Sequence, residues 1–276
     1  MADDMRGMRI TAIGTGFLAS ILMSGLSSSA ASAQPVRAFY EVYAAGMTIL
    51  QVEALFDISA TGYRIETRLR TQGIAASFVS GEQVSRVSGA WAGAVARPAT
   101  FYSQGTWRGQ ARLISLGWED GDPVVRRLEP ADEENREPVP QEARRGTIDS
   151  LSAIALLSRT VAGSGHCEGQ APVFDGRRRS IFLSSTVQQD LIRPWRAAWH
   201  GQALRCNFES RLLAGFLRDQ PRDRAAAPQR GTAWIAVPYP GAPPIPVRIE
   251  MASRWFGTAT AVLVRAEAST LAERRQ

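Results

Sequence analysis

The feature that most limits the fold of this 276-residue chain is a period-two alternation of apolar and polar side chains between residues 47 and 70. The first run, residues 47–59, puts five apolar side chains on one face: Leu50, Val52, Ala54, Phe56 and Ile58. After a Thr61-Gly62 turn, a second run places a matching set on one face: Tyr63, Ile65, Thr67 and Leu69. This period is typical of a strand with one buried face, and two such runs around a glycine turn predict a β-hairpin.

Similar patterns recur along most of the remaining chain, separated by glycine, proline and Asp-Gly turns. We expect further strands at 38–44, 82–91, 100–107, 110–118, 124–128, 179–187, 203–213, 232–237, 246–253 and 258–267. Residues 129–146 and 218–231 are polar and contain proline, so they are expected to be loops. Residues 34–270 are therefore predicted to form one mainly β domain, followed by a frayed tail at 271–276.

One segment, beginning near Asp149, has the period of a helix instead. Thr147 and Asp149 are both possible N-caps, and Gly163 is expected to end the helix. Six apolar side chains fall on one broad face: Leu151, Ile154, Ala155, Leu157, Val161 and Ala162. Ser152, Arg159 and Thr160 lie on the opposite face. The apolar arc is too wide to face water, so the helix is expected to pack on the sheet.

These two signals together predict the architecture. A sheet with one apolar face must be covered, and the only convincing helix is the natural cover. We therefore expect a strongly curved, open antiparallel β-sheet or half-barrel, with one main helix over its concave face. Such a sheet leaves a hollow of the kind that binds acyl chains or apolar segments.

The N-terminus has the three parts of a secretory signal peptide. Arg6 and Arg9 precede an apolar run at residues 10–26, and Ala31-Ser32-Ala33 supplies the small residues that signal peptidase requires. We expect cleavage after residue 33 and a soluble periplasmic protein that is peripheral to a membrane at most. A single membrane anchor is the alternative reading of the same run.

The two cysteines, Cys167 and Cys206, are expected to form a disulfide, because an exported chain meets an oxidising compartment. The bond would close a loop of about 40 residues, worth about 4 kcal/mol in the chain-entropy model. The rival hypothesis is a metal site formed by both cysteines with His166 and His200. Their spacing matches no compact zinc motif, so we expect neither a metal nor another cofactor.

The sequence carries no recognisable catalytic motif. His166 and His200 are the only imidazoles, and a Ser–His–Asp set could be drawn from Ser150 with Asp149 or Asp175. No nucleophile elbow surrounds that serine, and no glycine-rich phosphate loop precedes a helix. We therefore expect a protein that is not an enzyme. An undetected hydrolase is a weaker hypothesis than either a ligand-binding protein or an envelope scaffold protein.

All 32 basic residues are arginine, and the formal net charge is +6, so anionic partners are favoured. Nucleic acid is not expected, because the arginines are scattered and aromatic residues do not interleave with them. The run Arg177-Arg178-Arg179 could contact an anionic head group, although a solvated turn is the plainer reading.

Several segments together resemble a family of exported bacterial proteins, domain of unknown function family 3108. The segments are ARPATFYSQG, IDSLSAIALL, VFDGRRR, ALRCNFES with LLAGF, WIAV and PIPVRIEM. The resemblance covers nearly the whole of the expected mature chain. The family is similar in architecture to the periplasmic lipoprotein carriers LolA and LolB, in which helices cover the hollow of a curved sheet. The resemblance carries no catalytic residues.

The function we expect is non-catalytic binding of a lipid, an acyl chain or an apolar envelope component in the hollow. Candidate ligand-binding residues are Leu151, Ile154 and Leu157 on the helix, with Arg177 and Arg178 at the rim. The alternative is a cell-envelope assembly or scaffold protein that binds a protein or peptidoglycan through its outer surface. The oligomeric state is left open.

Overall fold

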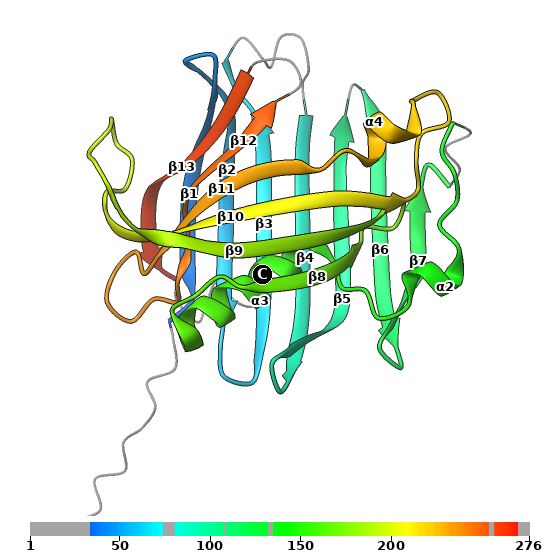
Figure 1. The fold of residues 1–276 in the computed structure, drawn as a ribbon, viewed down its shortest axis with the longest axis horizontal. Helices are drawn as coiled ribbons and strands as arrows, with labels where there is room; N and C mark the ends of the chain where they lie inside the picture. Colours follow the sequence, from blue (N-terminus) through cyan, green and yellow to red (C-terminus); the bar gives the residue numbers. More distant parts are fainter. Residues whose placement is uncertain (1–33, 74–80, 108, 132–134, 254–256, 270–276) are drawn as a thin grey trace, which may run out of the picture. The chain divides into compact units, whose positions relative to one another are not determined.

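Antiparallel strands make up most of the described chain, which comprises residues 34–73, 81–107, 109–131, 135–253 and 257–269 of a computed structural model (Figure 1). The strands of this part are β1 (Val36–Ala44), β2 (Met47–Ile58), β3 (Gly62–Thr71), β4 (Gly81–Ala92), β5 (Val95–Trp107), β6 (Gln110–Glu119), β7 (Asp122–Glu129), β8 (Gly169–Phe174), β9 (Arg179–Ile192), β10 (Gly201–Ala214), β11 (Gln229–Ala236), β12 (Ile245–Ser253) and β13 (Gly257–Ala268). All thirteen belong to one sheet.

The order of the strands places the two ends of the domain in the middle of the sheet. The order is β7-β6-β5-β4-β3-β2-β1-β13-β12-β11-β10-β9-β8, so every pair except β1 and β13 joins neighbours in sequence. Strand β1 runs antiparallel to β13 from the pair Val36 and Ala268 to the pair Ala44 and Ala259. The edge strands are β7 and β8.

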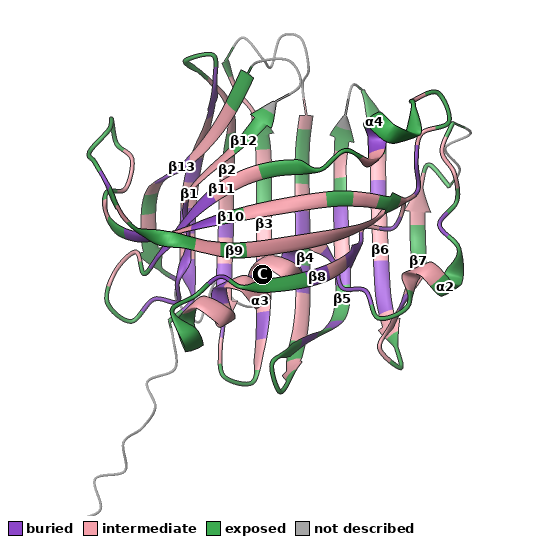
Figure 2. Ribbon diagram, viewed as in Figure 1, coloured by how far each residue is buried: buried purple, intermediate pink, exposed green. Residues whose placement is uncertain are grey.

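The sheet bends round on itself into a nearly closed, barrel-like form. Figure 1 shows β8, β9 and β10 running across the direction of β3 to β6. Figure 2 shows buried positions along both of these sets of strands. The largest fully buried apolar side chains are Phe174, Ile65, Leu116, Ile235, Ile245 and Leu263. The predicted mainly β, strongly curved antiparallel sheet with few helices is confirmed.

The main helix, α3 (Ser150–Ser164), begins at the expected cap. The Asp149 side chain accepts hydrogen bonds from the backbone amides of Leu151 and Ser152, both at 2.9 Å. The helix ends at Ser164, and the glycine that stops it is Gly165 rather than the predicted Gly163. Gly165 takes the left-handed conformation, with φ 71°, and its amide donates to the carbonyl of Val161.

Helix α3 packs against β2 to β5 on one side and β8 on another. The expectation that Ser152 lies on the face away from the core is wrong, because Ser152 is fully buried beside Leu151 and Ala155. A serine can be buried when its hydroxyl group has hydrogen-bond partners. Here the Ser152 hydroxyl is hydrogen-bonded to Asp149 and to Tyr63.

Other differences concern segments without a clear period. Strand β8 was not expected, since GQAPVF shows no alternation, and β9 continues to Ile192 rather than residue 187. The stretches read as polar loops contain the short helices α2 (Gln141–Arg144) and α4 (Arg222–Ala226). The described residues form one compact unit. The expected signal peptide (1–33) and tail (271–276) lie outside the described residues.

Gly215 provides a test of how closely the β8–β9 turn packs on the end of β10. It has φ +82°, and a Cβ there would overlap the carbonyl oxygen of Arg177 and lie 3.0 Å from the Cα of Arg178. We expect Gly215→Ala to lower the free energy of unfolding by about 2–4 kcal/mol, from backbone strain plus overpacking.

Gly241→Ala is the matched control, because Gly241 has φ +86° and a Cβ added there would meet no atom within 4 Å. It should lose only the strain, about 1–2 kcal/mol. Denaturant unfolding measures both values. Equal losses for the two variants would show that the turn does not constrain Gly215.

Candidate ligand-binding site

A cavity of about 820 Å³ lies between the inner face of β2 to β6 and the first residues of α3. Its apolar lining comes from Leu50, Leu69, Phe101, Ile114 and Leu151. The volume falls within the range of about 300–1,000 Å³ that is usual for small-molecule sites. The cavity is therefore large enough for one ligand of modest size.

The lining follows from the alternation seen in the sequence. On β3, Tyr63 and Ile65 are buried in the core, and Thr67 and Leu69 continue the same face into the cavity. Because side chains on a strand point to alternate faces, one set of positions supplies both the core and the cavity wall. Leu50 on β2 belongs to the corresponding apolar set.

Part of the wall is polar and already hydrogen-bonded. Ser85 on β4 and Ser103 on β5 are buried, and their hydroxyl oxygens lie 2.9 Å apart. The side-chain amide nitrogen of Gln83, Nε2, donates to the hydroxyls of Ser85 and Ser103, at 3.2 and 3.0 Å respectively. These groups satisfy one another, so this wall can accept an apolar ligand without leaving buried polar atoms unpaired.

Four arginines line the cavity against two carboxylates, which gives it an excess of positive charge. The arginines are Arg112, Arg136, Arg177 and Arg178, and the acids are Glu82 and Asp175. Guanidinium groups are favourable partners for carboxylate and phosphate groups because their planar donors match both geometries. The lining therefore combines apolar walls with cations suited to an anionic group.

The β8–β9 turn holds two of these arginines in place. The Asp175 side chain accepts from the backbone amides of Arg177 and Arg178, at 3.0 and 2.7 Å, and from the Arg178 guanidinium at 2.8 Å. The Arg177 guanidinium donates to the carbonyl of Pro130 at 2.6 Å. Arg136 in turn donates to the carbonyl of Gly215 at 2.7 Å, so all three are anchored to the backbone or to the turn.

The segment that precedes α3 connects the two edge regions of the sheet. The amide of Ile148 donates to the carbonyl of Pro172, and the amide of Phe174 donates to the carbonyl of Ile148, both at 2.9 Å. On the other side, the indole nitrogen of Trp118 on β6 donates to the carbonyl of Thr147 at 2.8 Å. Residues 147–149 therefore bridge β8 to β6 and fix the start of the helix beside the cavity.

Asp149 lies at the centre of a buried hydrogen-bond network. Its carboxylate accepts from the Ser152 hydroxyl as well as from two amides, and the Tyr63 hydroxyl lies 2.8 Å from the Ser152 oxygen. Burial raises the pKa of Asp149 to about 6, although the hydrogen bonds to Ser152 and Leu151 oppose this shift. The network ties α3 directly to β3.

The residues expected to bind ligand do not all meet in this cavity. Leu151, Arg177 and Arg178 line it. Ile154 packs instead on the main hydrophobic core, and Leu157 packs on a smaller cluster that contains both cysteines. Arg112 and Arg136 were not anticipated. They come from segments remote in sequence from the β8–β9 turn, and no local pattern distinguishes them from other arginines.

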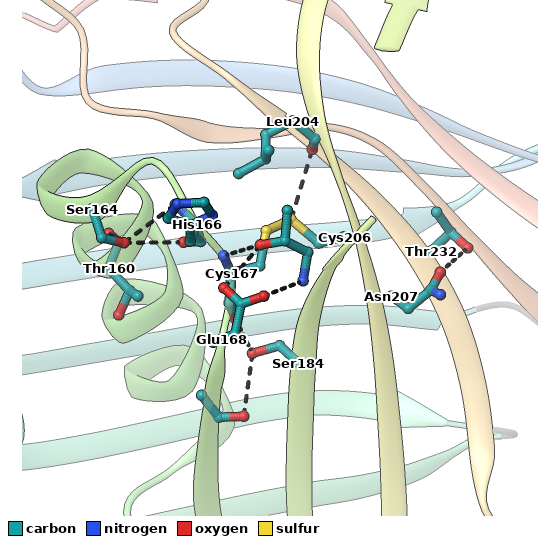
Figure 3. The surroundings of a disulfide bond; sticks show 12 residues. Thr160, Ser164, His166, Cys167, Glu168, Ser184, Leu204, Cys206, Asn207 and Thr232 are labelled. Atoms are coloured by element: carbon teal, nitrogen blue, oxygen red, sulfur yellow. Dashed lines mark hydrogen bonds between the residues drawn. A yellow bond between two sulfur atoms is a disulfide. The ribbon is translucent and has the colours of Figure 1, made fainter. Parts of the chain in front are cut away.

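Cys167 and Cys206 are joined by a disulfide, the pairing expected from the sequence (Figure 3). Both cysteines are buried, with Leu204 and Ile235 beside them and Leu157 and Val161 of α3 packed on the cluster. The bond therefore links the exit of α3 to β10, on the side of the helix opposite its contacts with Tyr63.

The histidines lie apart from this network. His166 and His200 are both exposed, and His166 follows the end of α3, about 20 Å of helix away from Asp149. Both thiols are used by the disulfide, so they cannot act as thiolate ligands. Within the described residues, no group of three or more His, Cys, Asp or Glu side chains is arranged to hold a metal.

A protein family model matches most of this chain and identifies the family to which it belongs. The model described as "Protein of unknown function (DUF3108)" matches residues 38–264. The chain belongs to this family. A search of curated proteins finds no match. Among the described residues of this DUF3108 chain, no helix is long and apolar enough to cross a bilayer.

Among solved structures, this DUF3108 chain is similar to a beta-barrel-like protein of domain of unknown function DUF1849 from Brucella abortus. The two share 15% identity with a TM-score of 0.50, over 86% of this chain and 98% of the Brucella chain. At this identity the similarity concerns the fold alone, and it agrees with the curved sheet described above.

The pKa of Asp149 leads to a stability prediction. Its folded value of about 6 exceeds the ordinary value of 3.8, so between these values the folded state holds the extra proton. This contribution to stability is therefore present at low pH and is lost as pH rises towards 6. The free energy of unfolding of the wild type, minus that of Asp149→Asn, should increase by up to about 3 kcal/mol when the pH is lowered from about 7 to about 4. A difference independent of pH would contradict it.

The disulfide leads to a second prediction. Replacing Cys167 and Cys206 together by alanine should lower the free energy of unfolding by about 4 kcal/mol, because the bond constrains the unfolded chain. Unfolding of the wild type with and without a reductant provides the comparison. The reduced wild type should approach the variant, and the variant should not respond to reductant.

Proposed function

We propose that this DUF3108 protein is an exported, non-catalytic periplasmic protein that holds a lipid, an acyl chain or an apolar envelope component inside its curved sheet. The cavity of about 820 Å³, with its apolar walls and its arginines, carries the proposal. Burial of an acyl chain against Leu50, Leu69 and Phe101 would provide the main favourable term, at about 25 cal/mol per Å² of apolar surface removed from water.

The arginines give this site a preference for ligands with an anionic group. Among the four arginines that line the cavity, Arg178 alone is classed as exposed, with 55% of its side chain accessible to solvent. An anionic group placed beside Arg177 and Arg178 would make charge-assisted hydrogen bonds while an apolar chain lies deeper. The proposed ligand is therefore an anionic amphiphile.

Export is supported by the N-terminal pattern of residues 1–33 and by the disulfide. The resemblance of the family to the lipoprotein carriers LolA and LolB supports the same class of function, by analogy of fold alone.

Native mass spectrometry of gently purified protein tests the proposal. We expect co-purified lipid, or binding of added phosphatidylglycerol. Leu69→Asp should weaken binding at least about tenfold, because it places a carboxylate against the acyl chain. Leu213→Asp is the matched control, since Leu213 on β10 is 42% exposed and does not line the cavity. It should bind as the wild type does.

Thermal unfolding of both variants verifies that they fold. Protein that is free of lipid and does not bind added phospholipid would overturn the proposal, and would favour an assembly or scaffold role through the outer surface. Equal loss of binding in the two folded variants would also count against this cavity as the site.

A further inference from the structure

A second cleft, of about 730 Å³, lies where the β1–β2 turn meets the end of β9 and strands β10 to β13. It shares no lining residue with the cavity beside α3. Its lining includes Tyr43, Leu191, Arg193, Trp195, Arg205 and Trp234. Its chemistry is accordingly aromatic and basic.

Exposed apolar side chains stand at this cleft. Leu191 is 59% exposed and Trp195 is 43% exposed, and Met47, next to the lining residue Gly46, is 46% exposed. Figure 2 shows the β9–β10 connection as largely exposed. Large apolar side chains gathered at one exposed place indicate an interaction surface, whereas isolated ones do not.

The exposed tryptophan is held in a fixed position. The rings of Tyr43 and Trp195 meet edge to face with centroids 5.0 Å apart. The Arg196 guanidinium lies 4.9 Å from the Tyr43 ring and 4.8 Å from the Trp195 ring. Arg196 reaches this position with φ 52°, a conformation that L-residues rarely adopt and that needs support from its surroundings. The loop is therefore ordered by stacking, with Trp195 left accessible.

The cations at the cleft exceed the acids that face them. Asp190 accepts from the Trp234 indole at 2.9 Å, and Glu250 accepts from Arg248 at 2.9 Å. The carboxylate of Glu41, on β1, accepts from the Tyr43 hydroxyl. Within the described part of the chain, Arg193, Arg196 and Arg205 form no ion pair with a carboxylate.

We propose that this cleft, with Leu191, Arg193, Trp195 and Arg196 at its mouth, is a docking surface for an anionic lipid bilayer. Tryptophan is favoured at the level of lipid head groups, and arginines near the surface are attracted to anionic lipids. A soluble anion would use the arginines but would leave Leu191 and Trp195 in water, so the combination favours a membrane. This role is separate from ligand binding in the cavity beside α3.

Vesicle co-sedimentation of the full protein is the test. We expect binding to vesicles of phosphatidylglycerol mixed equally with phosphatidylcholine, and much weaker binding to phosphatidylcholine alone. Binding should fall when salt is raised from about 0.1 M to about 1 M, since the Debye length shortens from about 10 Å to about 3 Å. The tryptophan fluorescence should shift to the blue as Trp195 enters the interface.

The double substitution Leu191→Asn with Arg193→Gln should lower the partition coefficient at least about tenfold, of which the arginine contributes about fivefold. The matched control is Val95→Asn with Arg145→Gln, because Val95 is 56% exposed, the Arg145 side chain is 72% exposed, and neither lines the cleft. The control should bind within about twofold of the wild type.

Three results would overturn the proposal. These are no vesicle binding, equal binding to both kinds of vesicle without salt dependence, and equal loss in the two double variants. In the first case, calorimetric binding of inorganic phosphate would assign the cleft to a soluble anion. Because the readout is partition to vesicles, it can fail while native mass spectrometry still detects lipid in the cavity, and the reverse also holds.

Discussion

The buried hydrogen bonds of Asp149 are the interaction on which most of this structure depends. One carboxylate caps α3 through two amides and also binds the Ser152 hydroxyl, which in turn meets Tyr63 on β3. In the two residues before Asp149, the backbone of Thr147 is hydrogen-bonded to β6 and that of Ile148 to β8. A single short segment therefore sets the start of the helix, the distance between the edge regions and one end of the cavity.

Helix α3 is held from two directions, which explains why a simple amphipathic description fails. Ser152 and Ala155 face the strands near Tyr63, and Arg159 lies over the Trp91 ring at 4.4 Å. Leu157 and Val161 pack on the disulfide cluster beneath β10 and β11. The helix thus separates two parts of one bent sheet, and both its polar and its apolar faces contact protein.

The sequence predicts the regular parts of this fold well, because local alternation and capping decide them. The hairpin of β2 and β3 and the cap at Asp149 depend on residues close in sequence, and the two cysteines are the only pair available in the sequence. The burial of Ser152 depends on Tyr63, which is 89 residues away. The end of α3 depends on which of Gly163 and Gly165 takes positive φ, and composition does not distinguish them. The cavity arginines Arg112 and Arg136 come together only after the sheet has curled.

The position of β13 has a consequence for the order in which the molecule can be completed. This strand follows the other twelve in sequence, yet it lies between β1 and β12 in the interior of the sheet. Every other pairing joins consecutive strands and can form as soon as each hairpin is available. A nascent chain that stops before Gly257 would hold two half-sheets with unpaired central borders, one ending at β1 and the other at β12. The seam between them closes only when β13 itself has emerged and can pair with both β1 and β12.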